Sequence, residues 1–170
     1  MSDWSPRATV ACVIAQQGKY LMVEERDKNS GKMVFNQPAG HLEPNETLAE
    51  GAMREVAEET GWSVKLQGVL GVALYSPPGS ELTYHRTTFV AAPLHSAENA
   101  VLDPDIHAVH WLGYEEILAL SDKLRSPLVL DSIARHRRGL CFPLDLISVP
   151  GASTRPTKSL SVCPAVSTPR

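Results

Sequence analysis

The sequence predicts an α/β (α+β) protein in which helices cover both faces of a mixed β-sheet. Two observations predict this class. Short apolar runs rich in β-branched residues are interleaved with three segments of helical pattern. The chain of 170 residues, 43% of them hydrophobic, is also long enough to bury one core. We therefore expect one domain over residues 1–149.

The first half of this domain begins with strands. Residues 8–15, ATVACVIA, are an apolar run that predicts a central strand. A Gln-Gln-Gly-Lys turn leads to a second strand over 20–23, and the polar stretch 24–32 is expected to be a loop. A short strand over 33–37 should end at Pro38, because proline cannot donate a hydrogen bond to a sheet.

A helix is expected from Leu48 to Thr60. Thr47 and Glu50 have the spacing of a capping box, in which the threonine accepts from the glutamate amide and the glutamate reaches back. Gly61 suits the left-handed position just past a helix end. Both ends of this helix are therefore predicted from local sequence.

The second half of the domain alternates strands and helices. Residues 62–75 form either two strand pieces or one bulged strand, because glycines interrupt the run. A strand over 82–92 should pair antiparallel with it, followed by a polar loop over 93–104 and a strand over 106–112. A short helix is expected over 114–120.

A third helix is expected to start with Ser126 as its cap and Pro127 in its first position, and to end before Gly139. Its last turn carries the basic residues 135–138, which the helix dipole favours. A solvated helix end explains this cluster, and a phosphate site is the alternative. From Pro150 the composition changes to Pro, Ser and Thr, so residues 150–170 are predicted to be a disordered tail.

Acidity is concentrated in one stretch, residues 40–62. The net charge of the chain is only −3, yet six carboxylates lie between Glu43 and Glu59, with Arg54 as the only base among them. Like charges at this density repel, and a multivalent cation relieves the repulsion. Hard oxygen ligands favour Mg²⁺, with Mn²⁺ as a substitute. The carboxylates are Glu43, Glu46, Glu50, Glu55, Glu58 and Glu59.

Helix geometry places three of these carboxylates on one side of the expected helix. At about 100° per residue, Glu55, Glu58 and Glu59 fall on one stripe of the expected helix. Gly51, one turn earlier, leaves space beside that stripe. A solvated acidic face is the ordinary explanation for such a stripe, and the residues around the helix argue against it.

The surrounding pattern is Gly40, five residues, Glu46, seven residues, and then REVAEETGW from Arg54 to Trp62. This pattern resembles the Nudix box of the Nudix hydrolase family, with every invariant position filled. Ala39 replaces a second glycine that many members have, and Trp62 replaces a smaller aliphatic residue. The resemblance implies an α/β/α sandwich and a metal-dependent hydrolase of diphosphate linkages in small molecules.

The resemblance also implies roles for individual residues. Glu58 and Glu59 correspond to the main side-chain metal ligands, with the Gly40 carbonyl beside them. Glu55 corresponds to a further ligand or to the general base that deprotonates water. The remaining two positions, Arg54 and its partner Glu46, orient these carboxylates.

Likeness beyond the box extends over residues 8–147 and is closest to a bacterial branch of the family, the NudJ-type phosphatases. It rests on ATVACVIA, NQPAGHLE, LRSPLV and FPLDLI. This branch implies hydrolysis of nucleoside tri- and diphosphates, thiamine pyrophosphate and hydroxymethylpyrimidine pyrophosphate, with release of orthophosphate. Asn36 and Gln37, which precede Pro38, are candidate substrate contacts near the metal.

Four further candidates lie outside the box. Tyr84 and Arg86 alternate onto one face of a strand, where an arginine can fork onto a phosphate and a tyrosine can stack on a ring. Cross-strand packing explains them equally well. Asp105 occupies the place where many Nudix enzymes have an extra acidic ligand or base, and an ordinary turn residue is the alternative; Asp103 is the weaker candidate.

Composition limits the other possibilities. The pI near 6.1 argues against a nucleic acid polymer as partner, and no apolar run is long enough to span a membrane. Three cysteines without a CxxC pair, with Cys12 in an apolar run, predict a buried free thiol and a cytoplasmic protein. We expect a monomer, with a dimer as the alternative.

Two alternatives to a NudJ-type phosphatase remain open from the sequence. One is a Nudix pyrophosphatase of another specificity, such as ADP-ribose, dinucleoside polyphosphates or damaged nucleotides. The other is a non-catalytic Nudix sensor that binds a nucleotide; the complete box argues against it. The motifs of serine hydrolases, P-loop proteins and dinucleotide-binding proteins are absent from the sequence.

Overall fold

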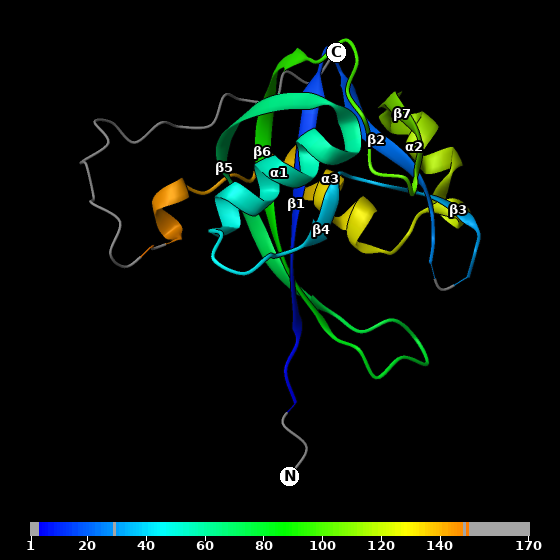
Figure 1. Ribbon diagram of the computed structural model, residues 1–170, viewed down its shortest axis with the longest axis vertical. Coiled ribbons are helices and arrows are strands. Elements are labelled where there is room, and N and C mark those ends of the chain that lie inside the picture. The colour runs from blue at the N-terminus through cyan, green and yellow to red at the C-terminus, as the bar shows by residue number, and fades with distance from the viewer. Residues whose placement is uncertain (1–3, 29, 148, 150–170) are drawn as a thin grey trace.

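The computed structural model describes residues 4–28, 30–147 and 149. Its centre is a seven-stranded sheet that all other elements contact (Figure 1). In chain order the strands are β1 Arg7–Gln16, β2 Lys19–Arg26, β3 Met33–Asn36, β4 Ala39–His41, β5 Trp62–Tyr75, β6 Tyr84–Ser96 and β7 Ile106–Gly113.

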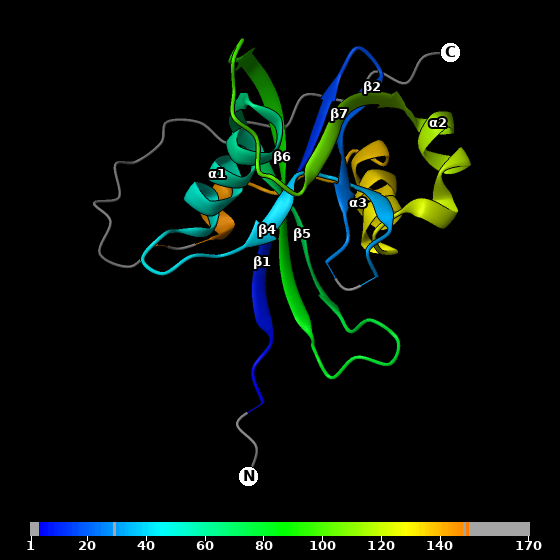
Figure 2. The ribbon, with the colours of Figure 1, turned by 45° about the vertical axis from the view of Figure 1, so that its right-hand side comes forward.

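Helices lie on both faces of this sheet. Figure 2 shows α1 on one side of the strands and α2 and α3 on the other, so the expected α/β/α sandwich is confirmed. The helices are α1 Leu48–Thr60, α2 Tyr114–Ala119 and α3 Leu128–Arg137, with short 3₁₀ turns at η1 Ser121–Lys123 and η2 Leu144–Leu146.

Strand β1 is the centre of the sheet, as its apolar run predicts. It pairs parallel with β6 and antiparallel with β2 and β4, and the main strand order is β3-β2-β1-β6-β5. Strand β7 pairs antiparallel with β2. One parallel pair among antiparallel pairs makes the sheet mixed.

Alternation along β1 divides the core into two layers. Val10, Cys12 and Ile14 pack with Ala52 and Val56 of α1. The residues between them turn to the opposite face, because side chains alternate along a strand. That second layer is Val13, Tyr20, Met22, Leu70, Val90, Ile117, Val129 and Ile133, under α2 and α3. Cys12 is a buried free thiol, as expected, and burial raises its pKa to about 12.

Two strands extend further than the sequence indicates. Strand β2 continues through residues 24–26, which were expected to be loop, and β6 continues through residues 93–96. Residues 24–26 stay in the sheet because β2 has a partner on each side at this point, β3 and β7. Glu25 and Arg26 are polar because they line a cavity.

Strand β4 is absent from the expected elements. Pro38 does end β3, but its carbonyl accepts from the Cys12 amide at 3.0 Å, and Ala39–His41 then pairs with β1. Residues 62–75 form one strand with register shifts at 66/68 and 69/71, which confirms the bulged alternative. The long β5–β6 hairpin extends beyond the body of the protein (Figure 1).

The start of α3 differs from the sequence prediction. Pro127 stands at the cap position and no side chain caps the helix, whereas Ser126 was expected to do so. Ser126 instead lines the cavity, and its backbone carbonyl accepts from the Val129 amide at 3.2 Å. Gly139 stands beyond the helix end, as predicted, and has a left-handed φ of +76°.

The disordered tail predicted over residues 150–170 lies outside the described residues. Within the described part of the chain, no helix is both long and apolar enough to cross a bilayer.

Candidate active site

Helix α1 is held at both ends by the predicted caps. The Thr47 hydroxyl accepts from the Glu50 amide at 3.2 Å, and the Glu50 carboxylate accepts from the Thr47 amide at 2.8 Å. Gly61 has a φ of +70° and donates to the Ala57 carbonyl at 2.9 Å. With its ends defined and its apolar face in the core, the helix presents a fixed acidic face.

Arg54 connects this acidic face. Its Nε and Nη2 form a fork on Glu46, at 3.0 and 2.8 Å. Its Nη1 donates to Glu55 and to Glu58, each at 2.9 Å, and Nη2 also donates to the His41 carbonyl at 3.0 Å. One planar guanidinium therefore orients three carboxylates and joins α1 to β4.

The fork makes Glu46 strongly acidic. Hydrogen bonds from Arg54 lower the pKa of Glu46 from its ordinary 4.5 to about 2, and the Glu43 amide donates to the same carboxylate at 2.7 Å. Gly51 is required beside it, because an added Cβ would lie 2.7 Å from Glu46 Oε1. The sequence predicted space at this glycine, and the structure shows that Glu46 fills it.

Glu59 is the most buried carboxylate of the stripe, with 8% of its surface exposed. Its Oε2 accepts from the Ala39 amide at 2.9 Å. Burial raises the pKa of Glu59 to about 9, against the lowering effect of that amide, and nearby Glu25, Glu55 and Asp103 raise it further. A buried carboxylate facing other carboxylates is the kind of group that a bound cation stabilises.

Glu55 is held between two neighbours. Burial raises its pKa, and the Arg54 guanidinium opposes that effect. Gly40 lies so close that an added Cβ would overlap the Glu55 carboxylate. Among the described residues Arg54 bonds only Oε1 of Glu55, so Oε2 remains available to accept a proton.

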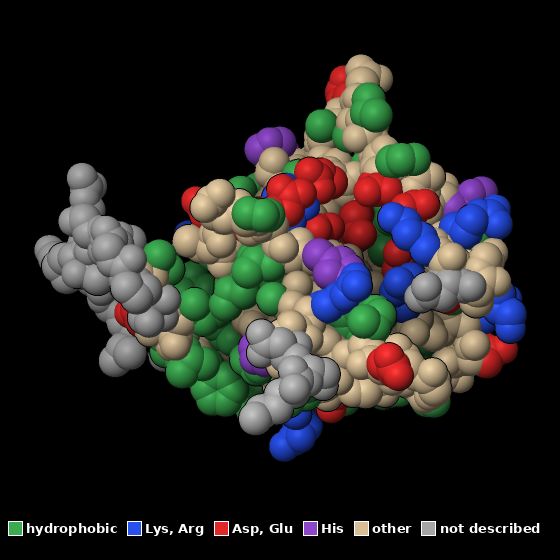
Figure 3. Space-filling view, turned by 60° about the horizontal axis from the view of Figure 1, so that its bottom comes forward, with side chains coloured by type: hydrophobic (Ala, Val, Ile, Leu, Met, Phe, Trp, Pro, Cys, Tyr) green, Lys and Arg blue, Asp and Glu red, His purple; other side chains and the backbone are tan. Residues whose placement is uncertain are grey.

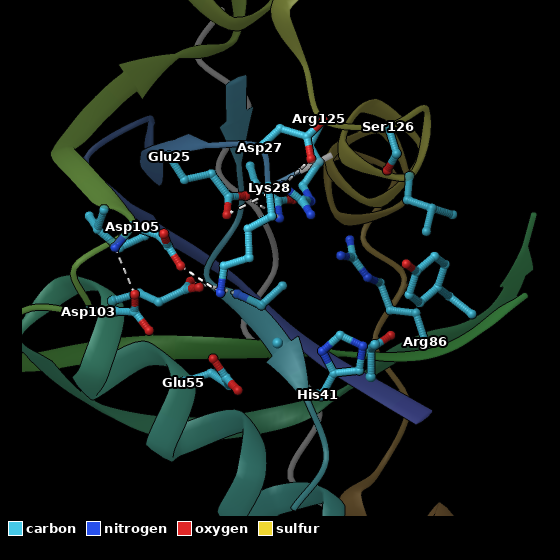
Figure 4. A pocket seen from close by; sticks show the side chains of 18 of the residues that line it. Glu25, Asp27, Lys28, His41, Glu55, Arg86, Asp103, Asp105, Arg125 and Ser126 are labelled. Atoms are coloured by element: carbon cyan, nitrogen blue, oxygen red, sulfur yellow. Dashed lines mark hydrogen bonds and ion pairs between the residues drawn. The ribbon is translucent and has the colours of Figure 1, made fainter. Parts of the chain in front are cut away.

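These carboxylates open onto a cavity of about 470 Å³. Figure 3 shows acidic side chains gathered at a hollow, with basic side chains beside them. In Figure 4, Glu55, Asp103 and Asp105 lie on one side of the cavity and Arg86, Arg125 and Ser126 on the other. The expected site residues that line it are Asn36, Gly40, Arg54, Glu55, Glu58, Glu59, Tyr84, Arg86 and Asp105.

Gln37 is not part of this cavity, contrary to expectation. The side chain is 1% exposed, and its Nε2 donates to the Val129 carbonyl at 2.8 Å. It therefore ties the end of β3 to the start of α3. Its neighbour Asn36, on the opposite side of the chain, does line the cavity and donates to Glu25 at 3.2 Å.

Asp105 lies at the cavity rim, with a different partner from the one expected. Its carboxylate pairs with Lys28 at 2.6 Å, and its amide donates to Asp103 at 2.9 Å. The Asp103 amide in turn donates to the Glu58 carbonyl at 2.9 Å, which fastens this loop to α1. Both aspartates line the cavity, so the structure keeps both as candidates.

Several cavity residues were missed by sequence reasoning. Glu25, Asp27 and Lys28 fall in the stretch assigned to a loop. Arg125 belongs to LRSPLV, which was used only for its likeness to the NudJ-type branch and gave Arg125 no role. Arg125 Nη1 lies 3.6 Å from Glu25 and 3.8 Å from Asp27. Residues 24–28 are an unbroken polar run, EERDK, so no period-two alternation in the sequence indicated that β2 continues through Glu25.

The donor set fits a hard divalent cation. Oxygen ligands from Glu55, Glu58 and Glu59 suit Mg²⁺, which keeps several waters and so needs few protein ligands. In residues 4–28, 30–147 and 149 no three potential ligands are already clustered for a metal. Arg54 holds Glu55 and Glu58 in place of a cation, and the buried, raised-pKa Glu59 is the group that such a cation would relieve.

The comparisons with known proteins agree with this geometry. A family model described as the NUDIX domain matches residues 4–131. A solved NUDIX hydrolase from Nitrosomonas europaea superposes with a TM-score of 0.82 at 36% identity, over 85% of this chain and 97% of that one. The chain belongs to the Nudix hydrolase family and is an enzyme acting on phosphorus-containing anhydrides.

Curated relatives narrow the comparison within the family. The proteins named phosphatase NudJ from Escherichia coli and from Shigella flexneri are each 41% identical over 144 residues. That match covers 85% of this chain and 92% of each relative. Enzymes of the family generally use divalent metal ions.

Proposed function

We propose that this chain is a Mg²⁺-dependent, NudJ-like phosphatase that releases orthophosphate from nucleoside tri- and diphosphates, thiamine pyrophosphate and hydroxymethylpyrimidine pyrophosphate. The observation that carries the proposal is the two-sided cavity, with the Glu55–Glu58–Glu59 stripe on one wall and Arg86 and Arg125 on the other. The similarity to the NudJ phosphatases supports it. Mn²⁺ is the expected substitute.

Glu58, Glu59 and the Gly40 carbonyl are the proposed metal ligands, with Asp105 as a further one. A bound divalent ion supplies charge neutralisation on the phosphate oxygens and makes water more acidic. Arg54 positions Glu55 and Glu58 through its 2.9 Å bonds, and Glu46 holds Arg54. These residues therefore fix where carboxylate oxygens stand before substrate arrives.

The proposed reaction is hydrolysis by direct attack of water. The water oxygen bonds to the terminal phosphorus, and the bond from that phosphorus to the bridging oxygen breaks. Glu55 Oε2 takes the proton from water, because Arg54 occupies only Oε1. The bridging oxygen leaves as part of the shortened phosphate. Orthophosphate carries the new oxygen.

Substrate contacts are proposed for three of the four expected residues. Arg86 donates to phosphate oxygens of the substrate, and the side-chain oxygen of Asn36 accepts a hydrogen bond from the substrate. The Tyr84 ring, 6.1 Å from the His41 ring, stacks on the organic part of the substrate. Gln37 is excluded by its bond to Val129. Since all these walls come from one chain, we propose that a monomer of 18.5 kDa is active.

Phosphate release is the test. Wild-type protein and Glu58→Gln are assayed with ADP, ATP and thiamine pyrophosphate, in Mg²⁺ and in chelator, with and without added pyrophosphatase. Orthophosphate that needs Mg²⁺ but no added pyrophosphatase supports the proposal. Signal that requires pyrophosphatase moves the cleavage to another bond. Hydrolysis of ADP-ribose or dinucleotides alone, or tight nucleotide binding without turnover, replaces the proposal with another specificity or with the sensor.

A further inference from the structure

Arg86 is a buried cation at the cavity. It lies on β6 at the cavity floor with 9% of its surface exposed. Its Nη1 is buried without a hydrogen-bond partner among the described residues. A buried, unpaired guanidinium is costly, so such a group is kept where a ligand completes it. We infer that Arg86 Nη1 donates to an anion that enters through the cavity.

Further unused donors and a second guanidinium surround Arg86. Thr9 lies beside it in the parallel register of β1 and β6, and its hydroxyl is also buried and unpartnered. Arg125 lies 3.6 and 3.8 Å from its two acidic neighbours, longer than the about 2.8 Å of a strong charge-assisted bond. Arg125 can therefore turn toward a ligand at small cost. Its backbone is fixed by a 2.9 Å bond to the Phe35 carbonyl.

Glu25 separates this basic wall from the carboxylates of α1. Its carboxylate accepts from Asn36 at 3.2 Å and faces Arg125. Its negative charge raises the pKa of both Arg86 and Glu59. Asp27 is a second carboxylate at this wall, 3.8 Å from Arg125, so the formal charges of the two guanidinium groups are balanced. An anion is therefore attracted by unused hydrogen-bond donors, Arg86 Nη1 and the Thr9 hydroxyl, which have no partner among the described residues.

The basic wall is also a closed end. Ser126 and Leu128 line the cavity beside Arg125, and Val129 immediately behind them is fully buried. The second hollow that Arg86 lines, between β5, β6 and α3, has about 10 Å³, enough for about one water molecule. A phosphate held here has packed protein behind it, so the ligand chain cannot continue past it.

We propose that Arg86 and Arg125, with Thr9, form a subsite for the free terminal phosphate of the substrate. The proposal rests on the proposed function and specifies its substrate class: anhydrides that end in an unesterified phosphate. A terminal phosphate offers three non-bridging oxygens and up to two charges, which matches two forked donors. Substrates esterified at both ends, such as ADP-ribose, cannot fill this subsite.

The test compares ADP, which has a free terminal phosphate, with ADP-ribose, which does not. Binding of each is measured by calorimetry in chelator, so that no turnover occurs. Wild-type protein is expected to bind ADP at least about 10-fold more tightly than ADP-ribose. Arg86→Met is expected to weaken ADP binding by about 10- to 100-fold and to change ADP-ribose binding by less than about threefold.

Two further variants sharpen the comparison. Arg86→Lys keeps the charge but loses the fork, so it should recover only part of the ADP preference. Arg135→Met removes an arginine of α3 that does not line the main cavity and pairs with Asp131 at 2.8 Å. It should leave both affinities unchanged. Circular dichroism confirms that each variant is folded.

Equal loss of ADP and ADP-ribose binding in Arg86→Met, or wild-type protein that does not prefer ADP, overturns the subsite. This result is separable from failure of the proposed function. Mg²⁺-dependent orthophosphate release without an ADP preference contradicts the subsite alone. An Arg86-dependent ADP preference without turnover contradicts the proposed reaction alone.

Discussion

Replacing Arg86 with methionine should make the fold more stable. Burial lowers the pKa of Arg86 from 12.5 to about 10, with repulsion from Arg125 adding to that effect. At about 1.36 kcal/mol per tenfold change, this lowering corresponds to a cost of about 3 kcal/mol for keeping the group charged. The folded pKa is below the unfolded one, so the cost is fully present at pH 7 and disappears only as pH rises above about 10.

Methionine keeps most of the apolar stem and removes the charge. Because it is smaller than arginine, part of the gain is lost to poorer packing, and we expect a net stabilisation of about 1 to 3 kcal/mol. Urea unfolding at pH 7, followed by circular dichroism and analysed by linear extrapolation, measures the free energy of unfolding. The slope of the transition should be unchanged.

Arg135→Met is the matched control for stability. Arg135 is half-buried and forms an ion pair with Asp131 at the surface, so its loss should change the free energy of unfolding by less than about 1 kcal/mol. If Arg86→Met instead destabilises the protein by more than about 1 kcal/mol, Arg86 has a stabilising partner within the fold. The argument from an unpaired buried cation is then wrong.

Three other substitutions test the acidic wall. Glu58→Gln should lower phosphate release at least about 100-fold with an unchanged unfolding midpoint. Loss of even a residue that only hydrogen-bonds a metal ligand lowers metal affinity or activity by about 10- to 100-fold. A near-normal rate at saturating Mg²⁺ contradicts the role of Glu58 as a ligand. Glu46→Gln should cost about 2 kcal/mol at pH 7, measured by urea unfolding. The folded pKa of Glu46 is lowered to about 2, so that difference should shrink as pH falls from about 4.5 toward 2; a pH-independent difference refutes the Arg54 fork as its cause. Gly40→Ala should destabilise by about 1 to 3 kcal/mol and reduce turnover, because the new methyl overlaps Glu55; wild-type unfolding and rate would show that β4 moves away freely.

Local chemistry was sufficient to predict helix α1 and its acidic stripe. The capping box at Thr47, the left-handed Gly61 and the bonds from Arg54 to Glu46, Glu55 and Glu58 all act within about 15 residues of sequence. Spacing along one helix and one short loop fixes such contacts. This is why the carboxylate wall could be predicted before any fold was known.

The opposite wall could not be predicted in the same way. Arg86 lies on β6 and Arg125 in the connection between η1 and α3, so they come together only when β6 pairs with β1 and α3 packs behind. Glu25 belonged to an expected loop because its polarity matched one, yet β2 keeps it in the sheet between β3 and β7. Its polar side chain is explained by a cavity, which has no local signal in the sequence.

Gln37 and Asn36 show most directly the difference between what local sequence and what tertiary structure decide. Both precede Pro38, and sequence reasoning placed both at the substrate. Strand alternation sends neighbouring side chains to opposite faces, so Asn36 reaches the cavity while Gln37 binds the Val129 carbonyl under α3. The sequence by itself determined the acidic helix α1, because its contacts are local. Tertiary structure decided the basic wall and the choice between these two amides, because burial and facing direction depend on which distant segments pack together.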